Sequence, residues 1–400
     1  IWTLLERIKM KRNLLALAVG TAIAMPGVAL ADAATIYGRM DLSLDRVSID
    51  EDTGTANDSG SNWEVNSHAS RFGVKGNADL GSGLKALYKI EWQVDADDGS
   101  DTLKARNRFV GLKGGFGTTL LGKMDSPMKS SQGKFDLFND WAGDIGNVVE
   151  GEVRASNTVA YITPKIADVF TGKAALVLVE ENEADGCKSH LNNTGLTFDA
   201  DDCDDGLTNA YSLSFAYEAN GLYAALAYDN NMPSTNIASS VDGLADVGIA
   251  LAGTTNPTLL AASNIIKAAA AVVRVDTVRL VGVYKIDAMQ LGVLYSQSDI
   301  EDEYLSGNFG IDADQTALIL NAAYTAGANT FKIQYGMSEI DADAIKDEEK
   351  TVLNLGAEHA FNKQTKVYAY YTAEEVDNTN FIDGVDSSES ALAFGMQHKF

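Results

Sequence analysis

Segments of about ten residues in which apolar and polar side chains alternate constrain the fold of this chain more than any other feature. The stretch Thr35–Leu44 puts an apolar row and a polar row on opposite sides of a strand, and Leu84–Val94 repeats the pattern. Ten residues at a rise of about 3.3 Å, tilted by about 40°, cover roughly 25 Å, which is the height of the apolar band of an outer-membrane barrel. The alternation therefore predicts strands with one face against hydrocarbon and one against water.

The spacing of these segments predicts a closed sheet. Short turns such as Ala219-Asn220-Gly221 alternate with long polar connections, as in barrels that place tight turns at one rim and long loops at the other. We therefore predict an all-β fold, a 16-stranded antiparallel transmembrane β-barrel, with strands near residues 34–47, 63–78, 83–95, 102–114, 117–125, 155–163, 171–181, 207–218, 222–230, 271–285, 288–299, 314–326, 329–340, 348–361, 364–376 and 387–400.

A soluble β-sandwich is the main structural alternative, because its strands also alternate. Sixteen strands of this length exceed one sandwich, Tyr and Phe cluster at strand ends as an interfacial girdle requires, and the chain stops on an aromatic residue within a strand. A helical membrane protein is excluded, since no stretch after residue 34 contains 18 consecutive apolar residues. The pattern favours the membrane barrel.

The first 33 residues have the layout of a secretory signal peptide. Lys11 and Arg12 precede the apolar run LLALAVGTAIAMPGVALA, and Ala31-Asp32-Ala33 is a small-residue cleavage site. A cut after Ala31 fits nearly as well, whereas a membrane anchor is disfavoured by Pro26 and Gly27 within a short apolar run. We expect a signal peptide over residues 1–33, with residues 1–9 as upstream read-through before Met10, and a barrel domain over residues 34–400.

The charge balance limits the partners of the mature chain. Residues 1–33 hold 4 of the 31 basic and 2 of the 56 acidic residues, which leaves 27 against 54 and a net charge of −27. Such a surface repels nucleic acid and suits cations or divalent-bridged anionic groups. A disordered acidic chain is excluded, because 46% of the residues are hydrophobic and 15 Tyr and 14 Phe are present.

Several segments resemble the Gram-negative general porin family. They are TIYGRMDLSL, SRFGVKGNADLGSGLKALYKIEWQV, ARNRFVGLKGGFGTTLLGK, RASNTVAYITP and the terminal GMQHKF. The resemblance runs through the whole mature chain and is densest over its first 130 or so residues and its last strand. It implies a homotrimer in the outer membrane of a Gram-negative bacterium, among lipid and lipopolysaccharide. It also implies a third external loop folded into the lumen, and a terminal Phe400 read by the outer-membrane assembly machinery.

The chain departs from the family pattern in three places. Lys123 stands where arginine is common, and the third loop lacks a Pro-Glu-Phe-Gly-Gly type sequence. The segment Asn230–Ala271 is unusually long and alanine-rich, and we assign it no role.

The side chains that point away from lipid are expected to line a water-filled pore. The alternation and the resemblance together predict a basic wall, with Arg154 assigned by resemblance alone, made of Arg39, Arg71, Lys75, Arg106, Arg108, Lys123 and Arg154. By resemblance, the segment between Asp125 and Arg154 is the constriction loop, and its acids are Asp136, Asp140, Asp144, Glu150 and Glu152. A basic wall facing an acidic loop would sort solutes by charge, with a modest anion preference. The alternative for any single residue is a solvated lumen side chain without selective effect.

Two cysteines, Cys187 and Cys203, flank an acidic loop and most simply form one disulfide in an exported chain. A transition-metal site is disfavoured, because only His190 is nearby. The aspartates of residues 199–205 could hold Ca²⁺ or Mg²⁺ together with lipopolysaccharide phosphates, although a solvated acidic loop is the simpler interpretation. We expect no resident cofactor.

Enzymatic function is disfavoured. His68 and Ser70 share a strand face, but no G-x-S-x-G elbow, acid partner, phosphate loop or H-E-x-x-H accompanies them, and His359 and His398 fit an interfacial position. The favoured hypothesis is a porin for passive diffusion of ions and small hydrophilic solutes. The alternatives are a solute-specific outer-membrane channel and, less favoured, a barrel hydrolase.

Overall fold

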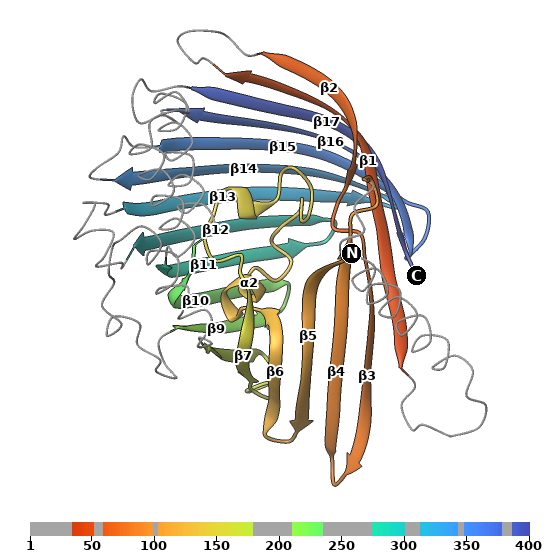
Figure 1. Cartoon of the computed structure of the whole chain (residues 1–400), viewed down its shortest axis with the longest axis vertical. Helices are drawn as coiled ribbons and strands as arrows, with labels where there is room; N and C mark the ends of the chain where they lie inside the picture. Colours follow the sequence, from red (N-terminus) through yellow and green to blue (C-terminus); the bar gives the residue numbers. More distant parts are fainter. Residues whose placement is uncertain are drawn as a thin grey trace, which may run out of the picture.

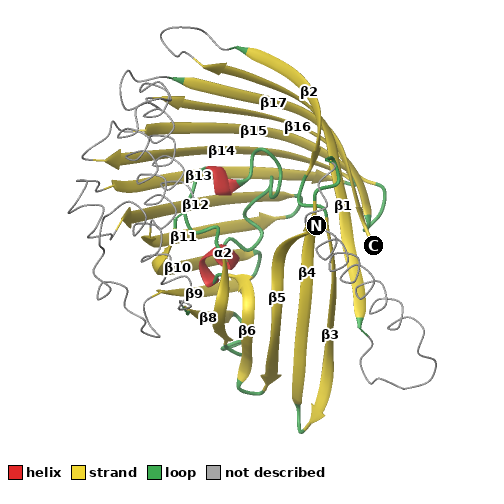
Figure 2. Cartoon of the chain, in the orientation of Figure 1, coloured by secondary structure: helices red, strands yellow, loops and turns green. Residues whose placement is uncertain are grey.

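The computed structural model describes residues 34–51, 59–98, 103–178, 210–234, 274–300, 313–342, 348–377 and 386–400. These residues form strands with only two short helical turns, α2 (Pro127–Ser131) and η1 (Ile145–Asn147) (Figure 2). The strands are β1(Thr35–Glu51), β2(Gly60–Ser67), β3(Arg71–Gly81), β4(Leu84–Val94), β5(Leu103–Gly114), β6(Gly117–Asp125), β7(Arg154–Ile162), β8(Phe170–Val177), β9(Ala210–Ala219), β10(Leu222–Pro233), β11(Arg274–Ile286), β12(Met289–Ile300), β13(Ala313–Ala326), β14(Asn329–Ala342), β15(Glu348–Ala360), β16(Thr365–Asp377) and β17(Ser387–Lys399). No helix in these ranges is long and apolar enough to span a membrane.

All described strands belong to one closed antiparallel sheet (Figure 1). Each strand from β3 to β17 pairs with the next, and β1 closes the cylinder by pairing with β17 on one side and with β2 and β3 on the other. The predicted 16-stranded antiparallel barrel is confirmed, and each predicted strand end falls within four residues of an observed one.

One predicted strand is interrupted. Residues 63–78 were expected as a single strand, but β2 and β3 are two halves separated by residues 68–70, where Ala69 has a φ of 47°. Both halves pair with the long strand β1, so together they fill one position in the cylinder. The break turns His68 inward, where its ring packs near Tyr368 and Tyr370.

The predicted alternation of faces is present along β1. Ile36, Met40 and Leu44 are exposed on the outside, whereas Asp41, Ser43 and Asp45 are buried on the inside. The short turns lie at one rim, for example at Asn220 and Gly221, whose positive φ values of 51° and 80° permit a two-residue hairpin. The strand ends that lead into the long connections lie at the opposite rim. The strands are therefore oriented as in a barrel with a tight-turn rim and a long-loop rim.

The connection between β6 and β7, residues 126–153, folds inside the barrel (Figure 1). Its apolar side chains pack against the inner face of the wall. Phe135, Ile145 and Val149 are fully buried against residues of β10 to β15. Further along, Phe138 and Trp141 pack on Tyr368 and Tyr370 of β16. We call residues 126–153 the constriction loop, because this packing fixes it across the lumen.

Wall amides add polar anchors to this packing. Asn321 donates to the Phe135 carbonyl at 2.7 Å, and Gln334 donates to the Gly143 carbonyl at 3.0 Å. Buried backbone carbonyls in a loop need such partners, because water no longer reaches them. The loop is therefore held by both apolar and hydrogen-bonded contacts with the wall.

Candidate pore constriction

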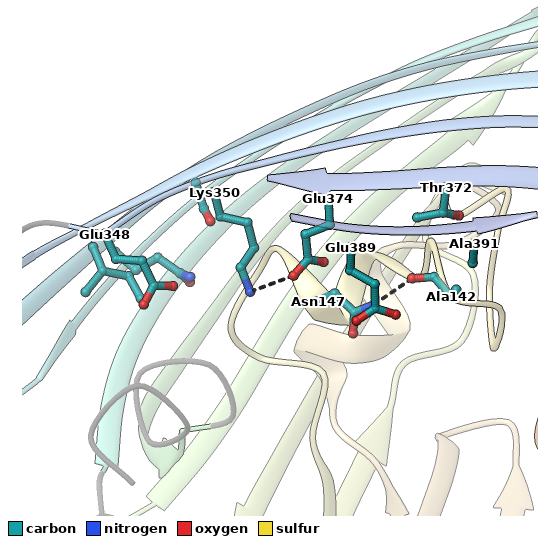
Figure 3. A pocket seen from close by; sticks show the side chains of 11 residues that line it. Ala142, Asn147, Glu348, Lys350, Thr372, Glu374, Glu389 and Ala391 are labelled. Carbon is teal, nitrogen blue, oxygen red and sulfur yellow. Dashed lines mark hydrogen bonds and ion pairs between the residues drawn. The ribbon is translucent and has the colours of Figure 1, made fainter. Parts of the chain in front are cut away.

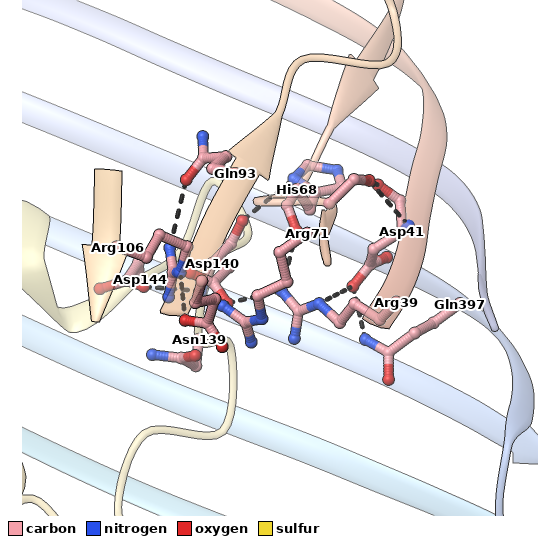
Figure 4. Close-up of polar contacts among 12 residues, drawn as sticks. Arg39, Asp41, His68, Arg71, Gln93, Arg106, Asn139, Asp140, Asp144 and Gln397 are labelled. Atoms are coloured by element: carbon pink, nitrogen blue, oxygen red, sulfur yellow. Dashed lines mark hydrogen bonds and ion pairs between the residues drawn. The ribbon is translucent and has the colours of Figure 1, made fainter. Parts of the chain in front are cut away.

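The tip of the constriction loop is in direct contact with the predicted basic wall (Figure 4). Asp140 Oδ2 lies 2.5 Å from Arg39 Nη2 of β1 and 3.5 Å from Arg71 Nη1 of β3. Asp140 takes a positive φ of 66°, and its backbone N–H donates to Asp144 at 2.6 Å. Burial alone would raise the pKa of the Asp140 carboxyl, but the charges of Arg71, Arg39 and Arg106 hold it below its ordinary value. Asp140 is therefore an ionised contact between loop and wall.

Arg106 extends the basic wall onto β5. Its Nε lies 3.1 Å from Glu91 Oε1, and its Nη1 donates to Gln93 at 3.2 Å. Glu91 also lies 3.2 Å from Lys89 Nζ and accepts a 2.8 Å hydrogen bond from the Tyr37 hydroxyl. Wall carboxylates thus neutralise part of the basic side that the sequence predicted.

Lys75 and Arg154 take different places. The Lys75 ammonium lies 4.8 Å from the centre of the Tyr37 ring, whose hydroxyl donates to Glu91. Arg154, at the start of β7, lies 2.8 Å from Asp125 at the end of β6. Arg154 therefore closes the base of the constriction loop rather than joining its tip.

Arg108 and Lys123 do not lie on the pore wall, which corrects the prediction. Arg108 pairs in register with Ile90 and Lys123, on the outward face, and its guanidinium lies 5.2 Å from the Trp92 ring. The cause is a β-bulge: β5 has one extra residue between the partners of Ile90 and Trp92. An extra residue reverses the alternation, so Arg106 points inward and Arg108 outward.

Two predicted loop acids also face away from the basic wall. Glu152 Oε1 lies 2.6 Å from Nη1 of Arg279, a fully buried β11 residue, and the Glu150 carbonyl accepts from the same guanidinium. The Glu150 carboxylate accepts from the Ser234 hydroxyl at 2.7 Å. Glu150 and Glu152 therefore anchor the returning end of the loop to β11. Sequence reasoning missed Arg279, although it occupies the inward row of VDTVRLVGV.

Asp136 and Asp144 shape the loop. Asp136 accepts from the Phe138 N–H at 3.0 Å, and Asp144 accepts from the Gly146 N–H at 2.7 Å. Burial raises the pKa of Asp136 well above its ordinary value, with a further contribution from the Asp144 charge. Burial likewise raises the pKa of Asp144, even though backbone N–H groups stabilise its charge. Both carboxyl groups therefore lose their charge at a higher pH than an exposed aspartate does.

A second basic group, missed from the sequence, lies under Trp141. Lys332 of β14 and Lys366 of β16 both contact Glu358 Oε1, at 2.5 and 2.6 Å, and their ammonium groups lie 4.8 and 5.0 Å from the Trp141 ring. Lys332 also donates to the Leu137 carbonyl at 2.8 Å. The period-two alternation could have identified both lysines, because they fall on the inward rows of their strands.

The histidine and serine considered for hydrolysis serve as structural groups. His68 Nε2 lies 2.6 Å from Ser43 Oγ, and Nδ1 lies 3.1 Å from the Asp140 carbonyl. Ser70 Oγ instead bonds the backbone of Asp41. His68 and Ser70 share no hydrogen bond in the described part of the chain, so they do not form a nucleophile and its base.

Other predictions lie outside the described residues: the signal peptide, Cys187 and Cys203 with their proposed disulfide, and the aspartates of residues 199–205. Phe400 is described. Its backbone exchanges two hydrogen bonds with Gly38, and its ring covers Gly38 so closely that a Cβ there would lie 2.4 Å from the ring. The terminal residue thus closes the seam between the last strand and the first.

Comparisons with known proteins agree with this geometry. A family model described as Gram-negative porin matches residues 15–379. Major outer membrane protein P.IB of Neisseria gonorrhoeae is 26% identical over 398 residues, which cover 98% of this chain and 100% of that protein. The anion-selective porin from Comamonas acidovorans matches with a TM-score of 0.64 at 20% identity, over 92% of this chain and 100% of the other. A trimer form of OmpT, an outer membrane protein of Vibrio cholerae, matches with a TM-score of 0.58 at 16% identity, over 92% and 99% of the two chains.

Proposed function

Because this chain belongs to the Gram-negative porin family, and is therefore an outer-membrane channel for passive solute diffusion, we propose that its charge selectivity is set where Asp140 meets the basic wall. The contact of one loop carboxylate with both Arg39 and Arg71 carries the proposal. That carboxylate is shared by two guanidinium groups, so the wall keeps an excess of positive charge.

A count of the neighbouring charges supports a modest anion preference. Five basic side chains, Arg39, Arg71, Lys75, Lys89 and Arg106, stand against three acidic ones, Asp41, Glu91 and Asp140, for a local net charge of +2. The raised pKa values of Asp136 and Asp144 mean that these loop carboxyls are the more readily neutralised ones. One structural neighbour is an anion-selective porin. A confined pore screens such charges incompletely, so the preference is graded.

The reversal potential in a KCl gradient tests this proposal. We expect the potential of channels reconstituted in a planar bilayer to have the sign of greater chloride permeability. A cation-selective potential would contradict the proposal while leaving the channel itself established.

We also propose a homotrimer. Arg108 and Lys123 lie on the outward face among Phe72 and Trp92, whose rings stack at 5.4 Å. A charge at the lipid face of a barrel costs about 2–4 kcal/mol near the bilayer midplane, so cover by a neighbouring subunit is the more stable arrangement. A structural neighbour has a trimer form. Light scattering of the detergent-solubilised protein should give the mass of three chains, and a monomer would exclude this arrangement.

Divalent-bridged lipopolysaccharide is the proposed partner of the long-loop rim. Four aspartates lie side by side in register on neighbouring strands, namely Asp276, Asp299, Asp314 and Asp341. Within the described ranges no three ligating side chains could hold a metal ion alone, so lipid phosphates would complete the coordination of Ca²⁺ or Mg²⁺. Lipopolysaccharide binding that persists after chelation by EDTA would contradict this proposal.

We also propose how the chain is processed and assembled. Residues 1–33 are removed on export, Cys187 pairs with Cys203, and Phe400 is the assembly signal. Mass spectrometry of the mature protein before and after reduction tests the first two. Phe400→Ala tests the third, with an expected loss of barrel assembly in cells but normal folding into detergent.

A further inference from the structure

A polar cavity of about 410 Å³ lies inside the barrel on the long-loop side of the constriction loop (Figure 3). Strands β13 to β17 form its wall, and Ala142 and Asn147 of the loop contribute to it. Its charged lining consists of Glu348, Lys350, Glu374 and Glu389. Three carboxylates against one ammonium give the cavity a net charge of −2, opposite in sign to the constriction beside it.

Two of these carboxylates face each other directly. Glu374 of β16 and Glu389 of β17 are partners in register, and both line the cavity. Lys350 Nζ lies 3.6 Å from Glu374 Oε1. Like charges directly opposite each other across an antiparallel pair destabilise the sheet unless a cation lies between them. The register thus favours a bound positive group at this point.

Thr372 gives an independent indication of a ligand. It lines the same cavity, is only 5% exposed, and its Oγ1 has no hydrogen-bond partner among the described residues. A buried hydroxyl without a partner is unfavourable, and its oxygen can accept from an N–H donor. Thr372 precedes Glu374 by two positions, so both side chains point to the same face.

The size and lining of the cavity fit a small organic ligand better than a metal ion. No three ligating side chains in the described ranges are placed to hold a metal. A volume of about 410 Å³ lies in the range of small-molecule sites. Guanidinium and ammonium groups offer several N–H donors to carboxylate and hydroxyl oxygens.

We propose that this cavity binds small organic dications that carry guanidinium or ammonium groups. One positive group lies between Glu374 and Glu389 and donates to Thr372, and the second compensates the remaining charge. The proposal rests on the channel function, and it adds a saturable binding step on the long-loop side of a constriction that prefers anions.

Bilayer recordings with L-argininamide, a dication, test the proposal. Added to the long-loop side, it should reduce the channel current in a saturable manner. Glu374→Gln with Glu389→Gln should raise the half-blocking concentration roughly tenfold. Thr372→Val, which keeps the shape of the side chain, should raise it by a smaller factor.

The chain offers a matched control. Glu339 and Glu349 are also directly opposed glutamates, on β14 and β15, but they are exposed on the outward face. Glu339→Gln with Glu349→Gln removes the same charge at the same rim, and we expect the block to remain as in the wild-type protein. An equal loss of block in this control would overturn the proposal in favour of general charge screening.

Calorimetric titration of L-argininamide into the detergent-solubilised protein separates this site from the channel function. Normal conductance without saturable binding overturns the site and leaves the channel intact. Binding in a protein that does not conduct overturns the channel instead. Displacement of L-argininamide by an equal concentration of Mg²⁺ would show an inorganic ion site and would also overturn the proposal.

Discussion

Asp140 Oδ2 at the tip of the constriction loop lies 2.5 Å from Arg39 Nη2 in the first strand, although the two residues are 101 positions apart. Their side chains are 16% and 12% exposed. Removing one partner of such a buried pair leaves a charge without compensation, which costs more than the pair itself contributes. This contact therefore joins the tip of the loop to the basic wall.

Neutralising the basic wall should change ion selectivity. In the double variant Arg39→Gln and Arg71→Gln, two positive charges leave the constriction while Asp140 remains, so we expect the reversal potential to shift toward cation permeability. The double variant Arg108→Gln and Lys123→Gln removes the same charge from the outward face. We expect it to retain wild-type selectivity. Equal shifts in both variants would show that these faces are assigned wrongly.

Asp140→Asn should release the loop tip. The amide cannot neutralise Arg39 and Arg71, so we expect greater anion selectivity together with larger fluctuations of the open-channel current. Single-channel recordings measure both quantities. The loop should stay inside the barrel, because Phe135, Ile145 and Val149 remain buried against the wall. Unchanged selectivity and noise would mean that Asp140 has no part in the constriction.

Acidification should strengthen the anion preference. Asp136 and Asp144 have raised pKa values in the folded protein, so each takes up a proton as pH falls through that raised pKa, which lies above the pKa in the unfolded chain. The loop then loses negative charge, whereas Asp140, whose pKa is lowered, stays ionised. Reversal potentials between about pH 8 and about pH 4 measure the change.

The variant Asp136→Asn with Asp144→Asn should remove most of this pH dependence and resemble the acidified wild-type channel. Both amide side chains can still accept the backbone hydrogen bonds of the loop. A pH dependence as large as that of the wild-type protein would assign the titration to other groups.

Arg279→Met should destabilise the barrel. Arg279 is fully buried, and it holds Glu152 at 2.6 Å. Lys129 Nζ still lies 3.1 Å from the other oxygen of Glu152, so the expected loss falls below the roughly 3–5 kcal/mol of a buried charge with no partner. It should still exceed the roughly 0–1 kcal/mol of an exposed pair. Urea unfolding in detergent measures the loss. Lys165→Ala is the control, because its pair with Glu218 is exposed.

Adding Glu152→Gln to Arg279→Met should recover part of the lost stability, because it removes a buried charge that then has only Lys129 as its ionic partner. No recovery in the double variant would indicate that packing of Arg279, and not its charge, stabilises the loop.

The sequence by itself determined the strands, most of their outward faces and the rim of short turns. Period-two alternation is a local property of each segment, as the inward Asp41 and outward Met40 illustrate. The inward positions of Arg39 and Arg71 follow from it without knowledge of any neighbour.

Only the tertiary structure decided the rest. A single extra residue in β5 moved Arg108 to the outward face, and no local pattern marks such a bulge. The partners of Glu150 and Glu152 on β11, and the opposition of Glu374 and Glu389, depend on which strands the closed cylinder brings into register. Alternation fixes the face that a side chain takes on its own strand, whereas charge pairing depends on contacts between segments far apart in the chain.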